Sequence, residues 1–168
     1  MERVDIWLTL FGAVVGAAIG FGASAGVVWN QKRNRKKYVA EKLNNLVGKY
    51  SVALKDGKKL KDTVLIDRGE NESLKTEATI INFISGGKEY GKTKTIGIIA
   101  FHEDNFIIGT GVYQFTTKGL ENRSGKSDIT IMKDNNNKIT IHVLNSYYNI
   151  FEHEVITEQL IWTKFEET

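Results

Sequence analysis

Hydrophobic and polar positions alternate along most of the chain after Gly48. In the clearest case Ile139, Ile141 and Val143 alternate with Thr140 and His142. A side-chain period of two is typical of a β-strand that buries one face. The pattern predicts eight strands, over residues 49–55, 63–67, 75–84, 93–101, 105–115, 126–132, 138–145 and 155–165.

Short segments rich in Gly, Asn and Asp separate these predicted strands, for example Asp56-Gly57 and Gly86-Gly87. Such segments are typical of tight turns, and hairpin-length connections favour an antiparallel meander. We therefore predict that residues 48–168 form one all-β domain, an antiparallel eight-stranded up-and-down barrel. A barrel of this size has room for side chains or one small ligand. A β-sandwich is the alternative fold.

The pattern before this domain is different, because residues 7–29 contain no charged side chain and have a tryptophan at each end. A helix of this length reaches about 34 Å at 1.5 Å per residue. This length matches a hydrocarbon core of about 30 Å, and tryptophan favours the membrane interface. We predict a flank and single transmembrane helix over residues 1–29. A cleaved signal peptide is the alternative, because Ala23-Ser24-Ala25 resembles a cleavage site.

Glycines recur every fourth position in the predicted membrane helix, at Gly12, Gly16 and Gly20. Residues four apart share one helix face, so these glycines would let a second backbone approach closely. The spacing favours a homo-oligomer that assembles through this helix, and a passive anchor is the alternative.

The formal net charge is only +3, and a basic cluster directly after residue 29 accounts for it. By the positive-inside tendency, the cluster predicts a cytoplasmic C-terminal domain and an outside N-terminus. We expect residues 30–47 to form a basic juxtamembrane helix in contact with the headgroups of the lipid bilayer. Because the charge is local, it does not favour a DNA or RNA polymer as partner. The cluster consists of Lys32, Arg33, Arg35, Lys36 and Lys37.

The residues that usually carry catalysis are scarce in this chain. It has no cysteine, which excludes thiolate metal sites and disulfides, and its three histidines have no metal-binding spacing. Gly125-Lys126-Ser127 resembles the end of a phosphate-binding loop but lacks the upstream glycine. We predict a non-enzymatic protein without a cofactor or metal site.

The sequence favours a small-molecule binding site in the barrel over a catalytic site. Aromatic rings could stack on a base, arginines could pair with phosphates, and polar strand residues could point inward. The candidate ligand-binding residues are Tyr50, Arg68, Asn82, Thr110, Tyr113, Gln114, Arg123 and Tyr147.

Gly48-Lys49-Tyr50 resembles the G-x-W opening of lipocalin-like barrels, with tyrosine in place of tryptophan. The anchor, basic segment and barrel together resemble the membrane-anchored β-barrel effectors of bacterial cyclic-nucleotide anti-phage defence. The best-known family of this kind has two transmembrane helices, whereas this chain is predicted to have one. The resemblance implies a protein of the bacterial inner membrane whose barrel senses a cyclic nucleotide and whose anchors oligomerise and disrupt the membrane.

Three functions follow as hypotheses. The first is this effector, with a cyclic oligonucleotide as its small ligand. The second is an anchored lipocalin-like binder of an apolar ligand, which a mainly apolar cavity without arginine would favour. The third is a structural or assembly subunit, which a barrel packed with its own side chains would favour.

Overall fold

The structure, a computed structural model, describes residues 28–102, 105–136, 138–149 and 153–165. The predicted membrane helix lies outside the described residues except for residues 28 and 29, and so do Gly12, Gly16 and Gly20. Within the described part, no helix combines the length and the apolar character needed to cross a membrane.

Residues 28–46 are α-helical, which confirms the helix predicted over residues 30–47. The chain divides into two units between Ala40 and Glu41. In the first unit, the guanidinium of Arg33 lies 5.5 Å from the centre of the Trp29 ring, one helical turn away. This distance allows a cation–π interaction along the helix surface.

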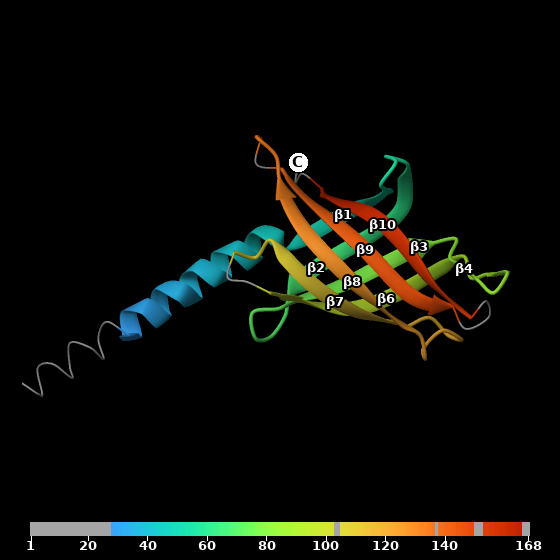
Figure 1. Cartoon of the computed structure of the whole chain (residues 1–168), viewed down its shortest axis with the longest axis horizontal. Coiled ribbons are helices and arrows are strands. Elements are labelled where there is room, and N and C mark those ends of the chain that lie inside the picture. The colour runs from blue at the N-terminus through green and yellow to red at the C-terminus, as the bar shows by residue number, and fades with distance from the viewer. Residues whose placement is uncertain (1–27, 103–104, 137, 150–152, 166–168) are drawn as a thin grey trace, which may run out of the picture. The chain divides into compact units, whose positions relative to one another are not determined.

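The second unit is a closed barrel of eight antiparallel strands (Figure 1). Each barrel strand pairs with the next along the chain, and the last pairs with the first, so the predicted up-and-down barrel is confirmed. All eight predicted strands are present. They are β1 (Gly48–Leu54), β2 (Lys59–Arg68), β3 (Leu74–Ile81), β6 (Lys92–Phe101), β7 (Ile108–Phe115), β8 (Ser124–Lys133), β9 (Ile139–Asn149) and β10 (Glu154–Lys164).

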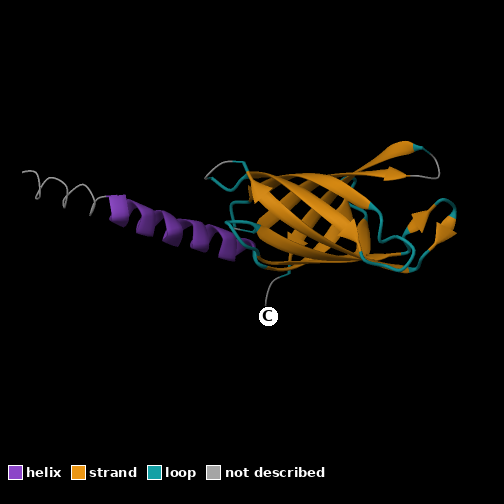
Figure 2. Cartoon of the chain, turned by 90° about the horizontal axis from the view of Figure 1, so that it is seen from below, coloured by secondary structure: helices purple, strands orange, loops and turns teal. Residues whose placement is uncertain are grey.

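The alternation in β9 is confirmed, because Ile141 and Val143 are buried while His142 between them is exposed. One element was not predicted. The segment between β3 and β6 forms its own small hairpin, β4 (Ile84–Ser85) with β5 (Lys88–Glu89), which projects from one end of the barrel (Figure 2). Gly86 and Gly87 form its turn with positive φ angles of 57° and 74°. The predicted turn is therefore the tip of an additional hairpin.

The end of the barrel where β1 begins is filled by apolar side chains. Leu43 and Leu46 are buried there, and the Tyr50 hydroxyl donates a hydrogen bond of 2.7 Å to the Leu46 carbonyl oxygen. Gly48 joins the helix to β1 with a φ of +143°, and a Cβ at this position would lie 2.7 Å from the Lys164 Cε. The positive φ favours glycine, whereas the flexible end of the Lys164 side chain could move away from a Cβ.

The opposite end, where β3 runs into the small hairpin, has a separate apolar cluster. Phe83, Phe115 and Leu120 form its buried part. With both ends packed in this way, the remaining space lies in the middle of the barrel.

Candidate ligand-binding site

A cavity of about 530 Å³ lies inside the barrel, within the size range of small-molecule sites. Its wall is mainly apolar, with aliphatic and aromatic side chains from several strands, and the polar side chains of Thr76, Thr95, Ser127 and Asn145 also line it. The aliphatic lining includes Val52, Leu54, Leu60, Val64, Ala78, Ile80, Ile99, Ile129 and Leu160.

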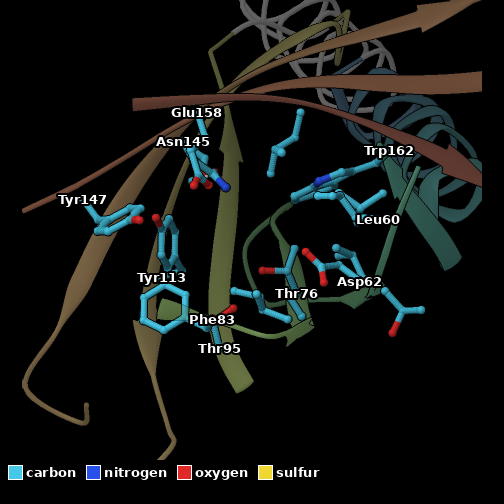
Figure 3. Close-up of a pocket in the computed structure, with 18 of the residues that line it drawn as sticks. Leu60, Asp62, Thr76, Phe83, Thr95, Tyr113, Asn145, Tyr147, Glu158 and Trp162 are labelled. Carbon is cyan, nitrogen blue, oxygen red and sulfur yellow. The ribbon is translucent and has the colours of Figure 1, made fainter. Parts of the chain in front are cut away.

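Tyr113, Tyr147 and Phe83 lie together on one side of the cavity (Figure 3). The Phe83 ring centre lies 5.1 Å from that of Phe115 and 6.2 Å from that of Tyr147. The ring centres of Tyr113 and Phe115 are 6.0 Å apart in an edge-to-face arrangement. Rings at these distances stabilise one another and present flat surfaces to a ligand.

Two carboxylates line the same cavity, Asp62 from β2 and Glu158 from β10. Burial raises the pKa of Asp62, although a 2.8 Å hydrogen bond from the Ile81 backbone N–H partly opposes this. Burial also raises the pKa of Glu158, and the negative charge of Asp62 adds to the rise. The Glu158 side chain is exposed and lines the cavity, and the surrounding wall removes part of its water.

Tyr113 lines the same cavity, and its hydroxyl is affected by the nearby charge of Glu158. Burial raises the pKa of its hydroxyl, and the charges of Glu158 and Tyr147 raise it further. Tyr113 therefore remains a neutral phenol that can donate a hydrogen bond into the cavity.

Trp162 contributes a donor without an acceptor. It is only 7% exposed and lines the cavity, and its indole Nε1 has no hydrogen-bond partner among the described residues. Leaving a buried donor unpaired costs about 1–3 kcal/mol. A ligand with a suitable acceptor would remove this cost.

The lining contains no arginine among the described residues, and its lysines, Lys59 and Lys61, are exposed. The described part also holds no group of three or more side chains suited to a metal ion.

Three of the predicted ligand-binding residues, Asn82, Tyr113 and Tyr147, line this cavity. Tyr50 does not, since its ring is fully buried in the apolar end of the barrel. Arg123 is buried too, and its guanidinium donates a hydrogen bond to the Ser85 hydroxyl in the small hairpin.

The other three predicted residues lie away from the cavity. Arg68 is exposed at the end of β2. Thr110 and Gln114 were expected to point inward, but they occupy the outer face of β7, because Gly111 and Tyr113 between them line the cavity. Thr110 instead contacts the exposed His102 at 2.5 Å, and the Gln114 amide donates to the Glu121 carbonyl oxygen.

The sequence analysis missed Asp62, Glu158 and Trp162. A signal for the two acids was present, because each shares its strand face with apolar residues. Asp62 alternates in phase with Leu60 and Val64, as Glu158 does with Trp162. A carboxylate on the apolar face of a strand is costly to bury and points to a functional site.

A second hollow of about 860 Å³ lies at the β1 end of the barrel unit and is basic. Its charged lining consists of Lys42, Lys133, Lys138 and Lys164, and four asparagines accompany them. This hollow presents donors for an anion, in contrast to the cavity inside the barrel.

Gly125 on β8 makes room for the Tyr113 ring, and we expect Gly125→Ala to lower stability by about 1–3 kcal/mol. A Cβ at Gly125 would collide with the Tyr113 ring and lie 2.8 Å from the Ser146 carbonyl oxygen. Gly111→Ala is the matched control, since its Cβ would meet its nearest atoms at 3.5 Å, an ordinary contact. Thermal unfolding of both variants checks this prediction, and equal melting temperatures would contradict it.

Comparison of the chain with protein-family models, with curated proteins and with solved structures gives no match. The function is therefore argued from the cavity itself.

Proposed function

We propose that the barrel binds one small, mainly apolar molecule in its lumen and serves as a lipocalin-like carrier or sensor. The observation that carries this proposal is the 530 Å³ cavity with a mainly aliphatic and aromatic wall. A barrel filled by its own side chains would instead have favoured an assembly subunit. The anchor predicted over residues 7–29 would hold this binder at a membrane.

Binding of a neutral fluorescent probe, N-phenyl-1-naphthylamine, to the full-length chain tests the proposal. We expect enhanced fluorescence and a higher melting temperature, because a ligand at 100 times its Kd adds about 2.7 kcal/mol.

A matched pair of variants locates the probe. Ala78 lines the cavity, whereas Ala100 is exposed on the barrel exterior. Ala78→Phe fills part of the lumen and should abolish binding, while Ala100→Phe adds the same ring outside and should leave binding intact. Probe binding that survives Ala78→Phe unchanged would refute a lumenal site.

The basic hollow favours a second candidate, the cyclic-nucleotide effector. An anion inside the barrel would face Asp62 and Glu158 without an arginine, whereas the hollow offers four lysines. In this candidate, nucleotide binding at the hollow controls assembly through Gly12, Gly16 and Gly20, and the assembly disrupts the inner membrane.

Titration with cyclic di- and trinucleotides separates the two candidates. The effector candidate predicts binding that Lys133→Glu with Lys138→Glu removes and that Ala78→Phe leaves unchanged. Loss of binding with Ala78→Phe would instead locate the nucleotide in the lumen. No binding by any member of the panel would count against the effector.

A further inference from the structure

Two acids that face the cavity have no ion-pair partner. Asp62 and Glu158 line it together with Lys59 and Lys61, but both lysines are exposed, and neither acid makes an ion pair with another described residue. A carboxylate removed from water without a positive partner is destabilising unless a proton or a cation neutralises it. The lumen is therefore electrostatically suited to a positive group.

The two acids act on the same space. Both line one cavity, and after burial the negative charge of Asp62 is the second cause that raises the pKa of Glu158. A cation close to both would offset this repulsion and lower the pKa of each acid.

Trp162 supplies an independent observation. Val52 on β1 pairs with Trp162 on one side, and the neighbouring Ser51 pairs with Thr63, next to Asp62, on the other. Trp162 and Asp62 therefore lie at about the same level of the barrel, and Figure 3 shows them on the same side of the cavity. The buried indole N–H has no acceptor, so the ligand should carry one close to its charge.

The aromatic rings suit the same ligand. Tyr113 and Tyr147 lie on the Glu158 side of the cavity in Figure 3. A ring face attracts a cation within about 6 Å, and the effect is larger away from water. The aliphatic remainder of the wall would contact a hydrocarbon body.

Resting on the proposed function, we propose that the lumenal ligand is an organic amine whose ammonium group binds Asp62 and Glu158. A hydrogen-bond acceptor next to the ammonium accepts from the Trp162 Nε1–H, and an apolar chain or ring fills the rest of the cavity.

Displacement of N-phenyl-1-naphthylamine from the full-length chain at pH 7 by octylamine, octanol and octanoate tests the charge preference. The three competitors share one chain and differ in the head group. We expect octylamine to bind at least tenfold more tightly than octanol, and octanoate to bind most weakly. Equal affinities, or a preference for octanol or octanoate, would overturn the proposed ligand class while leaving the apolar site intact.

Variants of Asp62 and Glu158 test whether these two acids cause the preference for the amine over the alcohol. Asp62→Asn combined with Glu158→Gln should reduce the ratio of amine to alcohol affinity to about one. This variant should fold, because it removes two charges that are costly inside the barrel, and circular dichroism checks this. Glu77→Gln, an exposed change on β3, is the control and should retain the preference. An undiminished preference in the double variant would refute the role of these acids.

An amine that contains an ether oxygen tests whether the ligand accepts a hydrogen bond from the Trp162 Nε1–H. 2-(Pentyloxy)ethylamine replaces one methylene of octylamine by oxygen, and it should bind more tightly than its hydrophobicity alone allows. Trp162→Phe removes the donor and should abolish that advantage while keeping the preference for amine over alcohol. If the probe itself does not bind the wild-type chain, the proposed function fails together with this inference.

Discussion

Replacing Tyr50 by alanine should lower the free energy of unfolding of the barrel by about 3–5 kcal/mol, the usual cost of removing a buried aromatic ring. Tyr50 is 0% exposed, and its hydroxyl donates a 2.7 Å hydrogen bond to the Leu46 carbonyl oxygen. Burial also raises the pKa of this hydroxyl, so it remains protonated and keeps donating. The change therefore removes ring packing inside the barrel and the bond from β1 to the last helical residue.

Thermal unfolding followed by circular dichroism measures this effect, and we expect a drop in Tm of roughly 10 °C or more. Tyr50→Phe separates the two contributions, because it removes only the hydroxyl and should cost about 1 kcal/mol. Tyr148→Ala is the control, since Tyr148 is 49% exposed and should change Tm little. A Tyr50→Ala variant as stable as Tyr148→Ala would contradict the packed end seen in the structure.

The barrel could be predicted because its determinants are local. Alternation such as Ile129 and Ile131 with Asp128 and Thr130 fixes which face of a strand is buried, and glycine-rich turns set the connections. The hairpin β4–β5 could not be predicted in this way. Its strands have two residues each, too short for any alternation to appear.

The site was only partly predictable because a one-residue error in strand phase exchanges the two faces. In β7, Gly109 and Gly111 carry no side chain to indicate the buried face, and the outer face holds Ile108 and Val112, which are exposed. Apolar residues on the outer face made Thr110 look inward. Tyr113 has the opposite phase and does line the cavity.

The resemblance to anti-phage effectors concerns architecture. Its structural elements and its implied functions have to be considered separately. The barrel and the helix before it are present. Nucleotide sensing and membrane disruption stay predictions, because the first depends on a ligand and the second on residues outside the described part. The two acids inside the barrel favour a different ligand chemistry there, whereas the basic hollow keeps an anionic ligand plausible at the other site.

The second large effect is expected at the opposite end of the barrel. Phe83 is almost fully buried, lines the cavity, and packs against Phe115, Tyr147 and Tyr90 with ring centres 5.1, 6.2 and 6.4 Å away. Its carbonyl oxygen accepts a 2.8 Å hydrogen bond from the Tyr90 N–H. The ring thus fills the end of the cavity and holds the segment that carries β4 and β5.

Phe83→Ala should therefore lower stability by about 3 kcal/mol, near the lower limit for a buried phenylalanine, because water can reach part of the vacated space. It should also release N-phenyl-1-naphthylamine at least tenfold faster, since the ring no longer narrows that end of the barrel. Stopped-flow dissociation and thermal unfolding measure the two effects. Val155→Ala is the control, because Val155 is 65% exposed on β10 and does not line the cavity, so it should change neither quantity much. Loss of stability with an unchanged release rate would mean that the ligand leaves by another route, and Phe83 would then be a packing residue alone.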